Sequence, residues 1–271
     1  MDIKSLEEKS YFLRQKTLET CLKAKTGHVT SSLSCVEILV SLYYGGFLEI
    51  NPKDLEDDDR DRFILSKAQA SPLLYTILAD LGLYDLKELD KFAQKDGIFG
   101  VHLQHSVPGV ESTAGALGHG LGLAAGIALR AKMDRKLFLT YTLLGDGELY
   151  EGSIWESLKF ASHNNLNNLV GIIDRNYLCT TDFTENLVEL EPLTDKIKAF
   201  GWNVIRVNGH CFKSLFEAFD NLRSRPSRKP TMIICDTVKG KGLKVMSYKP
   251  LCHGVPPKGE DIEIAKKELN I

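Results

Sequence analysis

The chain has 271 residues, of which 43% are hydrophobic, 26% charged and 8% aromatic, and its 34 Lys and Arg nearly balance its 36 Asp and Glu. These values are typical of folded soluble proteins, and they exclude a disordered tail, a collagen-like fibre and binding driven by nucleic-acid charge. The six cysteines show no CxxC spacing, which predicts reduced thiols and a cytoplasmic protein. The longest uncharged apolar run, residues 121–129, is too short to cross a bilayer, so we expect no membrane association.

Hydrophobic spacing predicts helices and strands in alternation. Helices are expected over residues 4–25 and 34–44, then a charged loop over 51–62 and a short buried strand over 62–66. The expected order continues with helix 118–132, strand 137–144, helix 152–164, strand 169–174, helix 192–200, strand 203–207, helix 213–222 and strand 231–236. Apolar strands separated by helices predict an α/β fold with a parallel sheet covered on both faces. We expect one domain over residues 1–271, with a C-terminal loop extension from about 239.

Polar residues follow two of the expected strands, at the edge where open parallel sheets bind ligands. Gly145-Asp146-Gly147 follows one strand, and Asn176 follows the next. If the two strands are neighbours, the Asp146 carboxylate and the Asn176 amide oxygen reach the same point. With a backbone carbonyl they form an incomplete oxygen shell, which suits Mg²⁺ when phosphates and water complete it. A Gly-Asp-Gly tripeptide alone is equally typical of a tight turn.

The Gly-Asp-Gly sequence with Asn176 at this spacing resembles the thiamine-diphosphate motif. Further segments resemble the N-terminal, diphosphate-binding half of transketolases. They are GDGELYEGSIWE at 145–156, KTGH at 25–28, DRFILSK at 61–67, PGVESTAG at 108–115, VKGKG at 238–242 and HG at 253–254. The resemblance runs from about residue 6 to 257, and it implies the thiamine-diphosphate-binding α/β fold of that family.

The resemblance also implies roles for single residues. Metal ligands would be the side chains of Asp146 and Asn176 and the carbonyl of Leu178. Gly147 would offer its amide to the diphosphate, and the other cofactor-binding residues would be Gly115, Leu117, Gly145, Gln69 and Glu151. Catalytic roles would fall to His28, His253 and His102, with His105 as an alternative to His102. Glu151 and Glu156 would lie at a subunit interface, whereas His119, His163 and His210 are interpreted as structural.

Two segments depart from the family pattern. The usual SKGHA is replaced by SKAQA, so that Ala68 stands for a glycine and Gln69 for a histidine of the cofactor site. The usual Pro-Gly-Gly after His28 is replaced by Val29-Thr30-Ser31. Glutamine forms hydrogen bonds but transfers no proton near neutrality. Either the chain has drifted while keeping ordinary sugar chemistry, or its donor or acceptor has changed.

The resemblance implies the N-terminal subunit of a split transketolase, a transferase that depends on thiamine diphosphate and Mg²⁺ (or Ca²⁺). It would transfer a two-carbon ketol unit from a ketose or ketose phosphate to an aldehyde. Nothing in the chain resembles the family's second domain, so we expect a partner subunit with the pyrimidine-binding and C-terminal transketolase domains, in a heterotetramer. The alternatives are the alpha chain of a 2-oxoacid dehydrogenase and a non-catalytic docking protein. A nicotinamide-binding domain is disfavoured, because the glycines at 118–122 have the wrong spacing.

Overall fold

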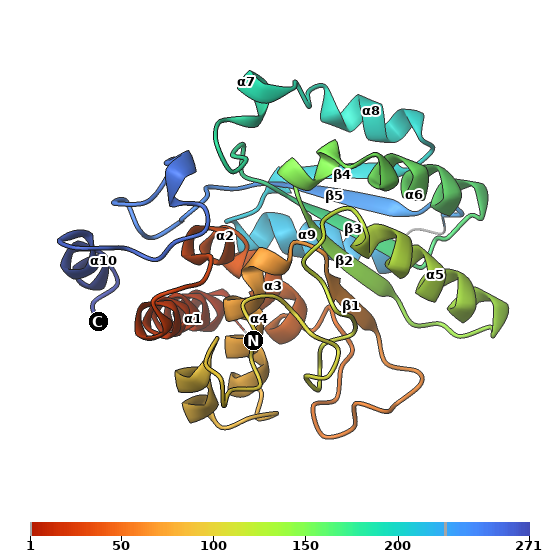
Figure 1. The fold of residues 1–271 in the computed structure, drawn as a ribbon. Helices are drawn as coiled ribbons and strands as arrows, with labels where there is room; N and C mark the ends of the chain where they lie inside the picture. The colour runs from red at the N-terminus through yellow and green to blue at the C-terminus, as the bar shows by residue number, and fades with distance from the viewer. Residues whose placement is uncertain (1, 225–226) are drawn as a thin grey trace.

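The structure, a computed structural model, describes residues 2–224 and 227–271, and its centre is a five-stranded parallel sheet of order β1-β2-β3-β5-β4 (Figure 1). All four neighbouring pairs are parallel. The strands are β1 (Arg62–Leu65), β2 (Thr140–Gly145), β3 (Leu169–Arg175), β4 (Asn203–Asn208) and β5 (Thr231–Asp236). This confirms the predicted parallel sheet and the predicted neighbourhood of the strands that precede Asp146 and Asn176.

Helices cover both faces of the sheet, as the apolar strands predicted (Figure 1). The first layer contains α1 (Ile3–Ala24), α3 (Val36–Tyr44), α4 (Ser71–Asp80) and α9 (Phe212–Ser224). The second contains α5 (Gly120–Met133), α6 (Gly152–His163) and α8 (Leu193–Ala199). Successive strand residues face opposite layers: Leu143 packs with the first and Leu144 with the second. Each layer therefore has its own hydrophobic core.

Several elements were not expected from the sequence, or begin elsewhere. The expected strand from residue 137 begins only at Thr140, because β1 supplies a pairing partner no earlier than that residue, and Leu137 is 93% exposed. The remaining unexpected elements are α4, α2 (Val29–Leu33), α7 (Thr184–Leu187), α10 (Asp261–Glu268) and the short 3-10 helices η1 (Ala68–Ala70), η2 (Leu86–Lys91), η3 (Gly147–Tyr150) and η4 (Pro250–Cys252). Helix α10 lies within the segment expected to be a loop extension.

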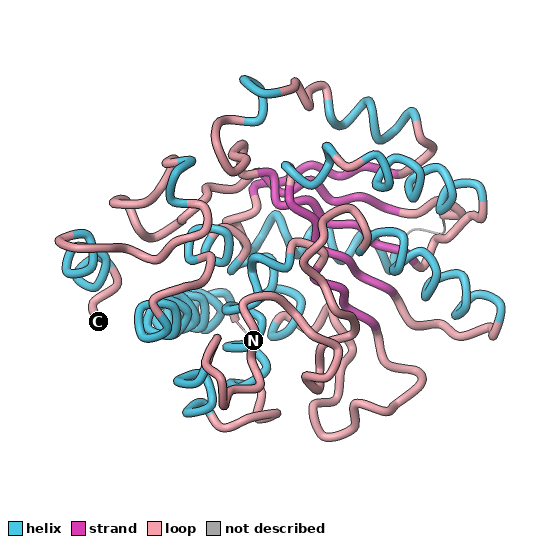
Figure 2. Tube along the Cα trace, viewed as in Figure 1, coloured by secondary structure: helices cyan, strands magenta, loops and turns pink. Residues whose placement is uncertain are grey.

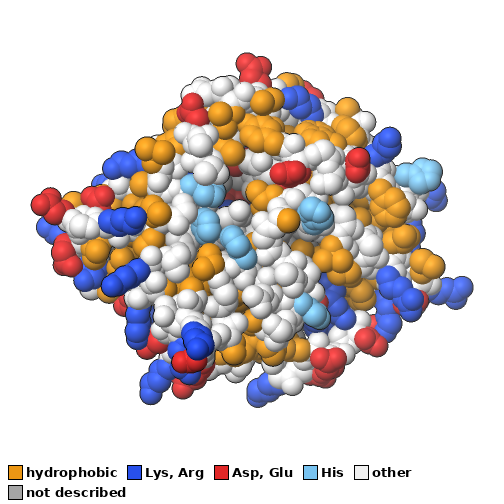
Figure 3. Space-filling view, in the orientation of Figure 1, with side chains coloured by type: hydrophobic (Ala, Val, Ile, Leu, Met, Phe, Trp, Pro, Cys, Tyr) orange, Lys and Arg blue, Asp and Glu red, His pale blue; other side chains and the backbone are white. Residues whose placement is uncertain are grey.

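The carboxyl ends of the strands lead into loops on one edge of the sheet (Figure 2). A long segment without helix or strand, residues 92–119, also joins η2 to α5. In the space-filling view, histidine side chains gather beside a hollow in this face (Figure 3). None of the described helices combines the length and the apolar character that a membrane span requires.

Candidate functional site

A pocket of about 480 Å³ lies where β2, β3 and β5 end. Its volume falls in the range that is usual for small-molecule and cofactor sites. The residues predicted from the sequence that line it are Gln69, Leu117, Gly145, Asp146, Gly147, Asn176, Leu178 and His253. The fold therefore brings together, in one cavity, residues spread over most of the chain.

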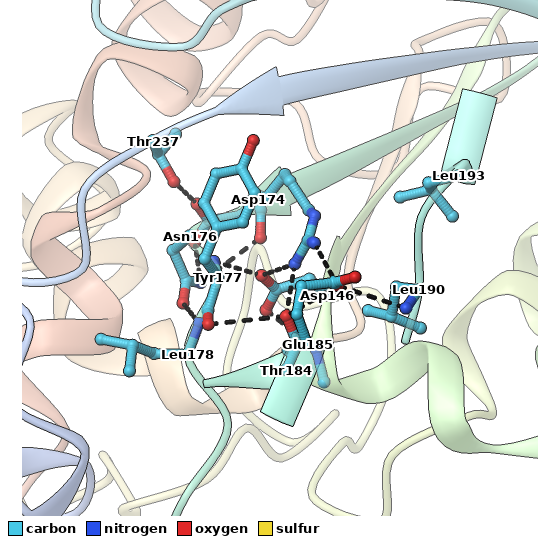
Figure 4. A network of polar contacts seen from close by, with 12 residues as sticks. Asp146, Asp174, Asn176, Tyr177, Leu178, Thr184, Glu185, Leu190, Leu193 and Thr237 are labelled. Atoms are coloured by element: carbon cyan, nitrogen blue, oxygen red, sulfur yellow. Dashed lines mark hydrogen bonds and ion pairs between the residues drawn. The ribbon is translucent and has the colours of Figure 1, made fainter. Parts of the chain in front are cut away.

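Three oxygen-bearing residues form one side of this pocket (Figure 4). The buried Asp146 carboxylate accepts hydrogen bonds from the Gly147 amide at 2.9 Å and from the Tyr177 amide at 2.6 Å. Asn176 accepts the Leu178 amide at 3.2 Å through its side-chain oxygen. Backbone amides thus hold both side chains in place, in the turns that follow β2 and β3.

The Asp146 carboxylate is short of positive charge, although it contacts an arginine. The Arg175 guanidinium donates to it at 3.1 Å. Even so, burial and the negative charge of Asp174 raise the pKa of Asp146. A cation bound at this carboxylate would therefore be stabilised.

Arg175 belongs to a network that extends from the pocket to the loop around α7 (Figure 4). Its side chain is fully buried, donates to Glu185 at 2.7 Å and Glu191 at 3.3 Å, and stacks over Tyr177 with 4.0 Å to the ring centroid. Sequence analysis gave Arg175 no role, because its three acidic partners are 10 to 29 residues away in the chain.

Two buried lysines bring positive charge to the same pocket. Lys67 forms an ion pair with the fully buried Asp174, which also accepts hydrogen bonds from Ser34 and Thr237. Lys239 donates to the Leu178 carbonyl at 3.2 Å, and burial together with the charge of Lys67 lowers its pKa to about 8. Both lysines stand in motifs that sequence analysis singled out, but neither was assigned a function there. Two lysines facing one cavity favour an anionic ligand.

Three predicted histidines meet at the mouth of the pocket. The ring of His28 lies 5.5 Å from that of His102 and 5.3 Å from that of His253, measured between centroids. His253 accepts a hydrogen bond from the Lys239 ammonium at 2.9 Å through Nδ1. The alternative to His102, His105, is bonded instead to the Val110 carbonyl at 3.2 Å. The geometry therefore favours His102 over His105 as the third histidine.

Burial keeps two of these histidines neutral at pH 7. The pKa of His28 is lowered to about 4 by burial and by the nearby charges of His102, Lys239 and Lys67. The pKa of His253 is lowered to about 3 by burial and by Lys239. Nδ1 of His28 is buried and has no hydrogen-bond partner among residues 2–224 and 227–271. A neutral imidazole with a free ring nitrogen can bond to a ligand or accept a proton.

The remaining predicted residues lie around the pocket. Gly115 packs against His102: a side chain added at Gly115 would meet that ring at 3.6 Å. Glu151 is exposed at the start of α6, and its predicted interface role stays a prediction. Glu148 was not predicted as a site residue, yet it is buried and accepts hydrogen bonds from Ser66, from the Gly118 amide at 2.9 Å and from the Gly145 amide at 3.2 Å. It ties the turn after β2 to the start of α5.

The site suits a metal that a bound ligand helps to coordinate. In the part of the chain that the structure describes, no three His, Cys, Asp or Glu side chains converge to hold a metal by themselves. Zinc sites and all-protein calcium sites rely on such clusters. One carboxylate, one amide oxygen and one carbonyl beside two lysines instead match Mg²⁺ or Ca²⁺ bound together with a diphosphate. Gly147 allows close approach, since an added side chain would meet the Cys179 sulfur at 3.2 Å.

Comparison with known proteins identifies the family. The domain described as "Transketolase, thiamine diphosphate binding domain" matches residues 8–271. The chain belongs to this family. The N-terminal part of Campylobacter jejuni transketolase has the same fold, with a TM-score of 0.92 and 32% identity over 100% of this chain and 43% of that one. This confirms the predicted family and fold.

Curated relatives of similar length are named as transketolase subunits. The chain is 36% identical over 270 residues to a subunit of the apulose-4-phosphate transketolase of Phocaeicola vulgatus, a match that covers 100% of this chain and 95% of the relative. It is 35% identical to a 6-deoxy-6-sulfo-D-fructose transketolase subunit of a Clostridium strain, over 97% of this chain and 96% of the relative. Human transketolase is 34% identical, and the chain spans 40% of its length. These matches favour the transketolase interpretation over the 2-oxoacid dehydrogenase alternative.

Proposed function

We propose that this chain is the diphosphate-binding subunit of a split transketolase, in which residues 1–271 form one domain. It transfers a two-carbon ketol unit from a ketose to an aldehyde acceptor together with a partner subunit. The observation that carries this proposal is the pocket lined jointly by Asp146, Asn176, Leu178 and two buried lysines. The names of the relatives of similar length support it.

In this proposal, Asp146, Asn176 and the Leu178 carbonyl bind Mg²⁺ or Ca²⁺, and Gly147 donates its amide to the diphosphate of thiamine diphosphate. The free ends of the metal shell are then filled by diphosphate oxygens and water. Lys239 must give up its bond to the Leu178 carbonyl when the metal binds, and its ammonium then serves the diphosphate. When bound, the cofactor supplies the electron sink that carbon–carbon bond cleavage requires.

Other residues around the pocket orient the rest of the cofactor. Leu117 lines the wall with Gln69 and Gly145, and Gly115 leaves room for the ring of His102. We assign Leu117 and Gly115 to the aminopyrimidine side. We assign Glu151 to the interface between subunits, where its exposure at the start of α6 leaves the carboxylate open to a partner.

The three histidines face the substrate in this proposal. His28 and His253 are neutral at pH 7, so each can accept a proton or a hydrogen bond from a sugar hydroxyl. His102 is exposed at the mouth of the pocket, where a donor sugar would enter. Together they hold hydroxyl groups in place while protons move near the reacting carbon.

The donor is proposed to be a ketose that carries an anionic group at its far end. Two relatives are named for such sugars: one for apulose 4-phosphate, with a phosphate, and one for 6-deoxy-6-sulfo-D-fructose, with a sulfonate. The replacement of the usual histidine by Gln69 in the pocket wall fits a donor other than the common ketose phosphates. The enzyme would then work in carbohydrate metabolism in the cytoplasm.

The proposed partner carries the pyrimidine-binding and C-terminal transketolase domains, and two copies of each chain form a heterotetramer. The relatives of similar length are each named as one lettered subunit of a transketolase, which supports the existence of a second chain. The test is an affinity purification of the tagged chain from native lysate with thiamine diphosphate and Mg²⁺, followed by mass spectrometry. We expect a stoichiometric partner with a pyrimidine-binding domain, and a complex active on ketose phosphates.

The matched control is Asp146→Ala, which should recover the same partner in a complex without cofactor or turnover. Recovery of homo-oligomers alone, or a wild-type complex that binds no thiamine diphosphate, would instead favour the non-catalytic docking protein.

A further inference from the structure

A buried ion pair and a histidine lie beside the site, outside the set of residues that line the pocket. Arg14 of α1 donates to Glu37 of α3 at 2.8 Å, and Nδ1 of His210, in the turn after β4, lies 2.9 Å from Glu37. The side chains of Glu37 and His210 are each only 10% exposed. A cluster of three buried ionisable groups calls for a physical reason, because burial of charge is unfavourable unless it is paired.

The hydrogen bonds determine where His210 carries its proton. The Val238 amide donates to Nε2 of His210 at 2.8 Å, so this nitrogen must be an acceptor. The proton of a neutral imidazole then resides on Nδ1 and is donated to Glu37. Glu37 is ionised: burial alone raises its pKa, but Arg14 and His210 together bring it down to about 2. The Arg14–Glu37 pair thus selects the tautomer that Val238 needs.

Val238 directly precedes Lys239, whose ammonium contacts the Leu178 carbonyl at 3.2 Å and Nδ1 of His253 at 2.9 Å. On either side of Val238, the backbone is held by other elements. The Thr237 amide donates to the Arg175 carbonyl at 3.0 Å, and the Gly240 amide donates to the Thr30 carbonyl at 3.0 Å. The bond from Val238 to His210 is the contact nearest to Lys239 in this series, so it controls where the lysine side chain begins.

We infer that His210 is a positioning residue: by accepting the Val238 amide it places the Lys239 ammonium in the pocket and so sets the affinity for thiamine diphosphate with its metal. Sequence analysis interpreted His210 as merely structural. The inference rests on the proposed function, because Lys239 matters only if the pocket takes a diphosphate. It assigns the Arg14–Glu37 pair a part in the site although neither residue lines the pocket.

Two variants of His210 separate the two hydrogen bonds. The side-chain amide of glutamine reaches about as far as Nε2 of histidine, so His210→Gln keeps an acceptor for Val238 and gives up the contact with Glu37. Asparagine reaches only as far as Nδ1, so His210→Asn keeps a donor for Glu37 and leaves the Val238 amide without a partner. Each variant loses one buried hydrogen bond, and each is therefore the other's control for stability.

The assay is binding of thiamine diphosphate with Mn²⁺ to the complete chain, followed by the Mn²⁺ paramagnetic resonance signal and by calorimetry. We expect His210→Gln to bind within about threefold of wild type and His210→Asn to bind about tenfold more weakly, the cost of one unsatisfied buried amide. Equal affinities in all three proteins, or equal losses in both variants, would overturn the inference. A wild-type chain that binds no cofactor would instead refute the proposed function, and the inference with it.

A second measurement does not depend on the variants. In the ¹⁵N spectrum of histidine-labelled wild type, His210 should show a protonated Nδ1 and a hydrogen-bonded, unprotonated Nε2 at pH 7. Its signal is assigned by its loss in His210→Gln, with His163→Gln as the surface control. A proton on Nε2 would exclude the bond to Val238 and refute the inference.

Discussion

Removing the charge of Lys67 is the sharpest test of the electrostatics of the site. Lys67→Met keeps the length of the side chain but leaves Asp174 without its counter-charge. The two side chains are 5% and 0% exposed, so water screens neither. Breaking such a buried pair costs about 3–5 kcal/mol. The hydroxyls of Ser34 and Thr237 still solvate the carboxylate, so we expect the lower end, a loss of about 3 kcal/mol.

The assay is urea unfolding at pH 7, monitored by circular dichroism, with the slope compared between proteins. Lys136→Met is the matched control, because Lys136 pairs with Asp59 on the surface and its loss should leave the midpoint unchanged. The double variant Lys67→Met/Asp174→Asn removes both charges and should recover part of the loss. A loss below about 1 kcal/mol in Lys67→Met would refute the reasoning, since it would mean that the pair is effectively solvated.

Three further predictions concern the metal, the buried ion pair and the pocket wall. Asp146→Asn should keep the fold but weaken binding of Mn²⁺ with thiamine diphosphate by at least about tenfold, as titrated by the Mn²⁺ signal; unchanged binding would exclude Asp146 as a ligand. Because the folded-state pKa of Glu37 is lowered from 4.5 to about 2, its ionised form stabilises the protein above pH 4.5 and that contribution disappears as pH falls towards 2. Glu37→Gln should therefore be less stable than wild type by about 3 kcal/mol at pH 7, and urea midpoints should converge at acid pH; a constant gap would contradict the assignment. Gln69→His, assayed in the assembled enzyme, should not improve turnover of common ketose phosphates if the donor has changed; a simple gain would show drift instead.

Much of the fold was predictable because its signals are local. Each strand of the centre of the sheet is a short apolar run, and each covering helix shows apolar residues at helical spacing. Helix α4 was missed for the opposite reason: nine of its ten residues are buried, so it shows no polar face from which a helix could be recognised. The start of β2 was placed three residues early, because apolar character at 137–139 does not reveal that β1 offers pairing only from Thr140.

Parts of the site were predictable from the order of the elements. Asp146 and Asn176 follow adjacent parallel strands, so their convergence follows from topology once the strands pair. The histidines were found by resemblance, and only the structure distinguishes His102 from His105. Lys67 and Lys239 stood in recognised motifs, yet nothing in one dimension shows that both ammonium groups face one cavity.

The sequence by itself determined the fold class, the family and the set of groups available for chemistry, because these follow from local patterns and short motifs. Tertiary structure alone decided which buried charges compensate one another. Arg175 reaches Asp146, Glu185 and Glu191 across three loops, and His210 joins Glu37 to Val238 over 173 and 28 residues. Hydrogen bonds depend on positions to within a fraction of an ångström, whereas sequence periodicity specifies only which face of an element is apolar.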